Sequence, residues 1–306
     1  MSEWLLEMDQ VHFSYPGAAR PALNGLSMSI PERKKCILLG RNGCGKSTLL
    51  LHANVIYRPQ RGVVKWRGEP MRYSRRELSR IRQKVGLVLQ DPEHQLVGAT
   101  VEEDISFGLC NAGLPESTIL QRLEKTLVRF DLLDLAQTPV HHLSLGQKKW
   151  VALAGVMALE PELLLLDEPT AALDSYHAGR LLEELDRLHE AGTTVMMATH
   201  DLDVALAWGE WIFVVDDGRL LLEGTPEEVF SQRDVLTELG LGMPLLAEIW
   251  QWLLEFGGNG RSVVGSGMPR NGKELRRWLS KLLKNPSCRG MTCGMDAMEQ
   301  KGEEKA

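Results

Sequence analysis

A glycine-rich loop, "GRNGCGKST" from Gly40 to Thr48, constrains this chain more than any other stretch. It fits the pattern G-x-x-x-x-G-K-[ST], and it lies between the apolar run "KKCILLG", typical of a strand, and "KSTLLLHANVIY", which has the pattern of a helix. Glycines let backbone N–H groups turn inward toward phosphate oxygens, and the helix N-terminus adds favourable partial charge. The alternative, a glycine-rich turn without a ligand, is disfavoured by this strand and helix context. The loop predicts an α/β fold that binds a phosphorylated ligand at a strand end.

Two positions of the loop receive specific expected roles. Lys46 can reach the β- and γ-phosphates of a nucleotide, and the Ser47 hydroxyl can take a Mg²⁺ position. The residues expected to bind the nucleotide here are Gly40, Arg41, Asn42, Gly43, Cys44, Gly45, Lys46, Ser47 and Thr48.

A second motif, "LLLLDEP", places two acids at the end of an apolar run. Leu163–Leu166 show no alternation, as in a parallel strand covered on both faces. Asp167 could hold the Mg²⁺ shell, and Glu168 could orient and polarise an attacking water. Two adjacent acids could instead mark the start of a helix.

Three further residues and one turn stand out. Tyr15 in "FSYPG", Gln90 in "LVLQDPEHQ" and His200 in "ATHD" each lie near a predicted strand, and each could instead be a core or loop residue. The turn "HLSLGQKKW" precedes a predicted helix. It can be an ordinary helix cap, a phosphate grip on a second molecule, or both, because a cap and a grip use the same N–H groups.

Taken in order, these segments resemble the nucleotide-binding subunits of ABC transporters over residues 1 to about 240. The segments are "FSYPG", "GRNGCGKST", "LVLQDPEHQ", "LSLGQKK", "LLLLDEPTAALD" and "ATHD". The resemblance implies a P-loop NTPase of the ABC-ATPase fold, with an antiparallel β subdomain and an inserted helical subdomain at about 91–160. It also implies that ATP and Mg²⁺ are the cofactors and that the chain hydrolyses ATP.

The resemblance assigns residue roles. Tyr15 would stack on adenine, and Gln90 would reach Mg²⁺ or the lytic water and sense a membrane subunit. His200 would bind the γ-phosphate. The expected catalytic residues are Glu168 and His200, and the expected Mg²⁺ ligands are Ser47, Gln90 and Asp167.

A site shared between two subunits is also implied. Ser144, Gly146 and Gln147 would bind the γ-phosphate of ATP held by the opposite subunit, and Asp174 would lie at that interface. Leu145 replaces the commoner glycine. Trp150 stands where the family usually has arginine, which puts the usual polar contact of that residue in doubt.

"QDPEHQ" and "VEEDISFGL" resemble the ATPases of energy-coupling-factor importers, and the whole chain looks most like the cobalt-uptake ATPases of that group. The implied partners are a second ABC ATPase subunit (the same chain or a paralogue), a transmembrane coupling subunit and a substrate-capture membrane subunit. Nickel or a vitamin remains an alternative cargo. A soluble ABC ATPase of translation or repair is a remote alternative, since those usually carry two cassettes or a coiled-coil insertion.

Composition and charge limit which other classes of function and location fit this chain. The net charge of −6 gives no support to a nucleic-acid partner. No apolar stretch approaches a membrane span, and "MSEWLLEMDQ" lacks the basic start of a signal peptide. We therefore expect a peripheral protein at the cytoplasmic face of the cell membrane. The scattered cysteines are expected to be free thiols: Cys36, Cys44, Cys110, Cys288 and Cys293.

The C-terminal part differs in character. After an ATPase domain at 1–240, residues 241–284 are expected to hold helices and the flexible linker "GGNGRSVVGSGMPRNG". Within them, "KELRRWLSKLLK" predicts a basic amphipathic helix that contacts anionic lipid, packs on the protein or is solvated. Residues 285–306 are expected to be disordered. Their Cys and Met side chains leave open a metal-sensing tail.

Overall fold

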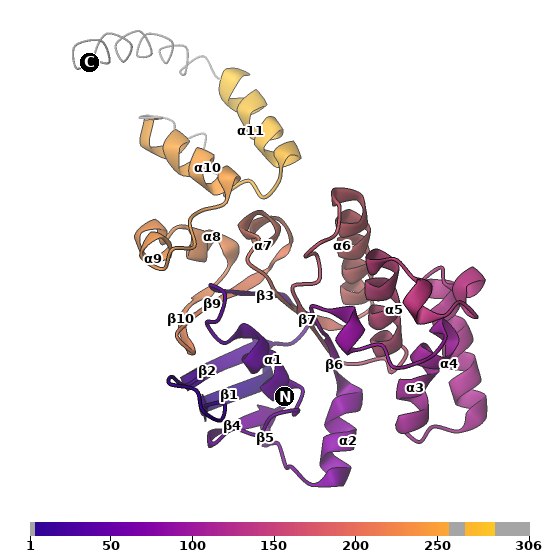
Figure 1. The fold of residues 1–306 in the computed structure, drawn as a ribbon. Coiled ribbons are helices and arrows are strands. Elements are labelled where there is room, and N and C mark those ends of the chain that lie inside the picture. The colour runs from indigo at the N-terminus through magenta and orange to yellow at the C-terminus, as the bar shows by residue number, and fades with distance from the viewer. Residues whose placement is uncertain (1–3, 257–266, 285–306) are drawn as a thin grey trace.

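The computed structural model describes residues 4–256 and 267–284. Its centre is a six-stranded sheet with the order β10-β9-β3-β8-β7-β6 (Figure 1). Neighbouring strands run parallel except for β10, which pairs antiparallel with β9. The strands are β3 (Lys35–Leu39), β6 (Val85–Val88), β7 (Leu163–Asp167), β8 (Thr194–Ala198), β9 (Trp211–Asp216) and β10 (Arg219–Gly224).

The unbroken apolar run of β7 follows from its place inside this sheet. Every residue of β7 is buried. Leu164 and Leu166 belong to one hydrophobic cluster, whereas Leu163 and Leu165 belong to another. Because successive strand residues point to opposite faces, both faces of the sheet are covered by apolar packing, as the sequence predicted.

A second sheet is antiparallel and has the order β2-β1-β4-β5. In it, Met8 lies opposite both Met28 and Val64. Its inward side chains share a hydrophobic cluster with the first sheet and with α1 (Lys46–Ala53). The expected antiparallel β part is therefore confirmed. Its strands are β1 (Trp4–Phe13), β2 (Leu23–Pro31), β4 (Arg61–Trp66) and β5 (Glu69–Pro70).

Helices fill the chain between β6 and β7, on the side of the molecule away from the four-stranded sheet (Figure 1). Their apolar faces join the cluster that covers one face of the parallel sheet. The expected inserted helical part is thus present. It contains α3 (Val101–Asn111), α4 (Glu116–Arg129) and α5 (Leu145–Met157), with the 3-10 turns η1 (Pro92–His94), η2 (Leu133–Leu135) and η3 (Val140–His142).

One boundary differs from the sequence prediction. The pattern of "RQKVGLVLQD" predicts a strand, but its first three residues belong to the helix α2 (Arg75–Lys84), and β6 begins at Val85. Ser74 caps α2 by accepting a hydrogen bond from the Glu77 N–H. Ile81 is the one fully buried residue of α2, and Leu78 packs partly buried on the same cluster, so only two apolar residues mark this helix in the sequence.

The remaining helices follow β7 in the chain. Thr225 is the N-cap of α8, and Pro226 lies in its first turn. In α11, Trp278 is buried and its ring lies 5.0 Å from that of Trp250 in α10, so this basic helix packs on the protein. The helices are α6 (Ser175–Glu190), α7 (Leu202–Trp208), α8 (Pro226–Phe230), α9 (Arg233–Glu238), α10 (Leu245–Phe256) and α11 (Gly272–Lys284).

No helix in the described ranges has the length and apolar character to cross a bilayer. Most of the predicted flexible linker and all of the predicted disordered tail, with its Cys and Met side chains, lie outside the described residues.

Candidate nucleotide site

A cavity of about 670 Å³ opens where several parallel strands end. The glycine-rich loop follows β3, Gln90 follows β6, Asp167 ends β7 and His200 follows β8. The carboxyl ends of parallel strands share one edge of a sheet, so segments far apart in sequence meet there. The cavity is lined by Tyr15, Arg20, Pro21, Ala22, Asn42, Gly43, Gly45, Lys46, Ser47, Thr48, Gln90, Asp167, Glu168, His200 and Asp217.

The loop needs glycine at two positions for different reasons. Gly45 has a φ of +111°, and a Cβ there would lie 2.4 Å from the Ala22 carbonyl oxygen. Gly43 has a φ of +81°, but a Cβ there would meet nothing within 4 Å. The loop is thus pressed against the segment before β2 at Gly45 and stands open at Gly43. Close approach of a phosphate to the backbone is possible at the open position.

We expect Gly45→Ala to lower the free energy of unfolding by roughly 1–3 kcal/mol, because the new methyl adds a clash to an unfavourable backbone conformation. Gly43→Ala is the matched control, since it carries the same kind of backbone penalty without the clash. Thermal denaturation of both nucleotide-free variants measures the difference. Equal melting temperatures would contradict the close contact with Ala22.

Lys46 lies at the first turn of α1 and is buried. Its Nζ donates hydrogen bonds to the carbonyl oxygens of Gly40, at 2.7 Å, and Arg41, at 3.3 Å. The same Nζ lies 4.0 Å from Glu168 Oε1. Gly40, Arg41 and Cys44 do not line the cavity with side chains. They shape the loop, and the buried ammonium stands inside it.

Asp167 and Ser47 form the part of the cavity that suits a magnesium ion. Asp167 is buried, and desolvation raises the pKa of its carboxyl group while a hydrogen bond from Ser47 opposes the rise. In the described part of the chain no group of three or more His, Cys, Asp or Glu could hold a metal by itself. Mg²⁺ commonly binds one or two carboxylates together with substrate phosphates, so this donor set fits it when a nucleotide is bound.

Glu168 adopts a left-handed backbone conformation, with a φ of +46°. Its Oε2 lies 2.9 Å from His200 Nδ1. Its Oε1 is buried and, among the described residues, makes no hydrogen bond. Strained backbone at a polar cavity is typical of functional sites. One carboxylate oxygen is therefore held by a histidine, while the other is available to a water or substrate.

Tyr15 lines the cavity beside the loop and is about one-third exposed. Its hydroxyl lies 3.0 Å from Thr48 Oγ1, and its ring meets that of Phe13 edge to face. It is therefore not a buried core tyrosine. Arg20 and Asp217 also line the cavity but were not predicted, because they lie in turn segments that the sequence marks only by Pro and Gly.

Gln90 is exposed at the cavity, and the segment that follows it is tied to α5. Gln95 Oε1 accepts a hydrogen bond from the Leu89 N–H at 2.9 Å, and its Nε2 donates to the Ala152 carbonyl at 3.4 Å. Gln95 is another residue that the sequence did not single out. Its side chain connects Leu89, the residue before Gln90, to Ala152 in α5.

The turn before α5 is a helix cap. Ser144 and Gln147 form a reciprocal capping box, with the Ser144 N–H donating to Gln147 Oε1 at 2.8 Å. Asp174 caps α6 with its side chain alone, accepting from the His177 N–H at 2.8 Å. None of Ser144, Gly146, Gln147 and Asp174 lines the cavity around Lys46. The structure therefore separates these four predicted residues from the others within one chain.

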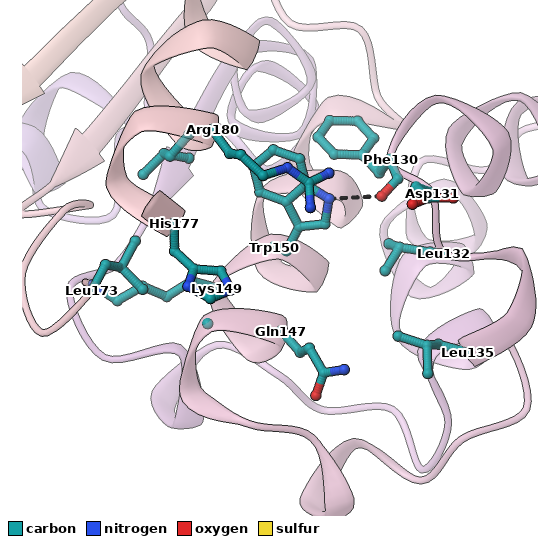
Figure 2. A pocket seen from close by; sticks show the side chains of 12 residues that line it. Phe130, Asp131, Leu132, Leu135, Gln147, Lys149, Trp150, Leu173, His177 and Arg180 are labelled. Atoms are coloured by element: carbon teal, nitrogen blue, oxygen red, sulfur yellow. Dashed lines mark hydrogen bonds between the residues drawn. The ribbon is translucent and has the colours of Figure 1, made fainter. Parts of the chain in front are cut away.

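Trp150 makes a polar contact at the position where the usual polar contact of the family's arginine is in doubt. Its Nε1 donates to the Phe130 carbonyl at the end of α4, at 2.7 Å, and the Arg180 guanidinium from α6 lies over its ring (Figure 2). The indole and these neighbours line a separate cavity of about 240 Å³ that reaches Gly146 and Gln147. Trp150 thus makes a polar contact of its own at this position.

The described cysteines behave as expected. Cys36, Cys44 and Cys110 are free, whereas Cys288 and Cys293 lie outside the described residues. Burial raises the pKa of the Cys44 thiol, which stands within the loop.

Comparison with known proteins identifies this arrangement. The ABC transporter family model matches residues 23–171. The energy-coupling factor transporter ATP-binding protein EcfA of Carboxydothermus hydrogenoformans is 42% identical over 278 residues, which cover 91% of this chain and 98% of that protein. A Nostoc protein, provisionally named an ABC transporter ATP-binding protein, is 54% identical over 250 residues, which cover 82% of this chain and 91% of that protein.

Solved structures agree with these relatives. CbiO1 of Clostridium perfringens, described as part of the ABC transporter complex CbiONQ, is 37% identical, with a TM-score of 0.68 and coverage of 81% of this chain and 99% of that one. This chain therefore belongs to the ATP-binding subunits of ABC transporters, of the energy-coupling-factor type, which are ATPases coupled to transport.

Proposed function

We propose that this chain is the motor subunit of an importer for cobalt ions, with ATP and Mg²⁺ bound at the cavity around Lys46. The ATPase part of this proposal rests on one observation. Four side chains line one cavity: Lys46, Asp167, Glu168 and His200. Support for cobalt comes from the similarity to CbiO1 of the CbiONQ complex. Nickel or a vitamin is the alternative cargo, because the chain itself shows no site for the cargo among its described residues.

In the proposed chemistry, each part of the reaction is assigned to side chains or backbone groups of this chain. The loop and Lys46 would bind the phosphates, and Tyr15 would cover the adenine. Mg²⁺, held by Ser47, Asp167 and Gln90, would neutralise phosphate charge. Glu168 Oε1 would accept a hydrogen bond from the attacking water, and His200 would hold the carboxylate and contact the γ-phosphate.

The proposed assembly is a dimer of two ATPase subunits, either two copies or two related chains. Ser144, Gly146, Gln147 and Asp174 lie outside the cavity of their own chain, as residues that serve the opposite subunit's ATP would. A structural neighbour that is 28% identical, with a TM-score of 0.66 and coverage of 72% of this chain and 98% of that one, is described as a dimeric ATP-binding cassette bound to ADP and Pi. Its dimeric state supports the proposal.

The subunit would dock at the cytoplasmic face of the cell membrane on a transmembrane coupling subunit, which works with a substrate-capture membrane subunit. Motion would pass through the segment after Gln90. Residues 1–240 would form the ATPase domain, and residues 241–284 would add C-terminal helices. Purification of the native complex from membranes, with this subunit bound, tests the docking.

Uptake of radiolabelled Co²⁺ and Ni²⁺ by cells that express the native gene cluster tests the cargo. Uptake of cobalt that disappears with Glu168→Gln supports the proposal. Uptake of nickel without uptake of cobalt would show that nickel is the cargo and overturn the cobalt assignment. No uptake of either metal, with the complex intact in the membrane, overturns the metal assignment and favours a vitamin.

We expect Ser144→Arg to lower ATP turnover by more than about tenfold while the affinity of the isolated subunit for ATP changes less than about twofold. A bulky cation in the turn would block the opposite subunit's phosphate from the helix N-terminus. Turnover and equilibrium ATP binding measure the two effects separately.

Ser74→Arg is the matched control, because Ser74 caps α2 as Ser144 caps α5 and does not line the cavity. Its turnover should remain near that of the wild type. If both variants lose turnover equally, the effect comes from a lost cap, and the shared site is contradicted.

A further inference from the structure

A buried lysine joins the helix α5 to the loop that carries Glu168. Lys149 lies one turn after the capping box of α5, and it is 7% exposed. Its Nζ donates to the carbonyl oxygens of Ala171 at 2.6 Å and Pro169 at 3.0 Å, and lies 3.4 Å from that of Glu168. An ammonium has three donors and here meets three acceptors. The side chain is thus fully engaged with a single loop.

Burying this charge is unfavourable, and the local electrostatics show how it is tolerated. Desolvation lowers the pKa of Lys149, while the nearby carboxylates of Glu168 and Asp91 favour its charged form. Asp91 follows Gln90 directly, so the ammonium stands between α5, the Glu168 loop and the Gln90 segment. Buried ammonium groups are rare unless their donors are satisfied, as these are.

The loop that Lys149 holds is conformationally strained. Glu168 and Ala172 both have positive φ values, +46° and +59°. Non-glycine residues keep such conformations only when their surroundings enforce them. The loop's own turns, Ala171 N–H to the Glu168 carbonyl at 3.1 Å and Leu173 N–H to the Thr170 carbonyl at 3.2 Å, are short-range. Lys149 supplies a contact to this loop from a different helix.

We propose that Lys149 is a positioning residue that fixes the Glu168–Ala171 loop to α5, and so couples the Ser144–Gln147 turn to the orientation of the Glu168 carboxylate in the same chain. It does not line the cavity around Lys46, so it is not placed to contact a nucleotide bound there. A turn that closes on the opposite subunit's ATP would move α5, and Lys149 would transmit that movement to the chain's own catalytic loop. This inference rests on the proposed roles of Glu168 and of the turn.

The test is Lys149→Met in the full-length protein, since methionine keeps most of the apolar stem and removes the three donors. We expect kcat for ATP to fall about tenfold or more, with KM and equilibrium ATP affinity within about twofold of the wild type. We also expect faster backbone hydrogen exchange confined to residues 168–173, with α1 and the rest of α5 unchanged. Lys149→Gln, which keeps a shorter donor, should recover part of the loss.

Lys125→Met is the matched control, because Lys125 is exposed on α4 and pairs with Glu160 at 2.7 Å, away from the loop. Its kcat should stay near that of the wild type. A kcat within twofold of wild type for Lys149→Met, or unchanged exchange at 168–173, overturns the proposal. Loss of the folded state in both Lys149 variants also overturns it in favour of a purely structural role.

Glu168→Gln, measured alongside, separates the positioning role of Lys149 from the catalytic role of Glu168. If it retains wild-type turnover, the catalytic assignment of Glu168 fails whatever Lys149 does. The exchange pattern of Lys149→Met then still reports whether this lysine holds the loop. If Glu168→Gln is inactive but Lys149→Met is normal, the positioning role alone fails.

Discussion

Glu168→Gln is expected to lower ATP turnover by roughly 100-fold or more and to leave a stable ATP-bound dimer, because a general base contributes about 10²–10⁴-fold to a proton-transfer step. The substitution keeps the shape of the side chain. A glutamine oxygen can still accept the hydrogen bond that His200 Nδ1 makes at 2.9 Å. What disappears is the charged, basic oxygen at the position of Oε1, which is buried and makes no hydrogen bond among the described residues.

The expected separation of binding from hydrolysis follows from geometry. The contacts of Lys46 with the Gly40 and Arg41 carbonyls do not involve Glu168, and Lys46 Nζ is 4.0 Å from the nearer carboxylate oxygen. ATP affinity should therefore be retained. Size-exclusion chromatography with ATP and Mg²⁺ measures the dimer, and phosphate release measures turnover.

Glu162→Gln is the matched control for this prediction. Glu162 stands at the other end of β7, where its carboxylate pairs with Lys84 at 2.6 Å and Arg67 at 2.8 Å. The control removes the same charge beside the same strand without touching the cavity. Its turnover should remain within about twofold of wild type. Wild-type turnover in Glu168→Gln would instead show that another group activates the water.

Local patterns explain why much of this site could be predicted. Each of these signals occupies a short stretch of sequence. They are the glycine spacing around Lys46, the unbroken apolar run of β7, and the places of Gln90 and His200 just after a strand. Each reflects a constraint within a few residues, such as a required φ or a strand buried on both faces. Short-range rules therefore place these residues at strand ends, whereas the expected roles of Gln90 and His200 come from the resemblance to the ABC family.

Other features depend on contacts that no local pattern encodes. Arg20 and Asp217 reach the cavity because their turns pack beside the loop, as the close approach of Gly45 to Ala22 shows. The helix α2 offers only two apolar residues to the core, Leu78 and Ile81, so its sequence carries a short apolar signal. The partners of Lys149 lie about twenty residues away along the chain. Such features follow from tertiary packing.

Lys46→Ala is expected to weaken ATP binding by about 100-fold. Hydrogen bonds to charged groups contribute roughly 1.5–3 kcal/mol each, and about 1.4 kcal/mol corresponds to a tenfold change in affinity. The ammonium stands within the loop, buried and directed at the Gly40 carbonyl at 2.7 Å. Its loss would remove both the proposed phosphate contact and a bond that shapes the loop. Calorimetric titration of the purified subunit with ATP measures the effect.

Lys35→Ala provides the control for this prediction. Lys35 begins the strand β3 that leads into the loop, and its Nζ pairs with Asp186 at 2.9 Å, a contact outside the cavity. Its ATP affinity should stay within about twofold of the wild type. If Lys46→Ala binds ATP as tightly as Lys35→Ala does, the buried ammonium only shapes the loop. Phosphate recognition then falls to the backbone N–H groups and the N-terminus of α1.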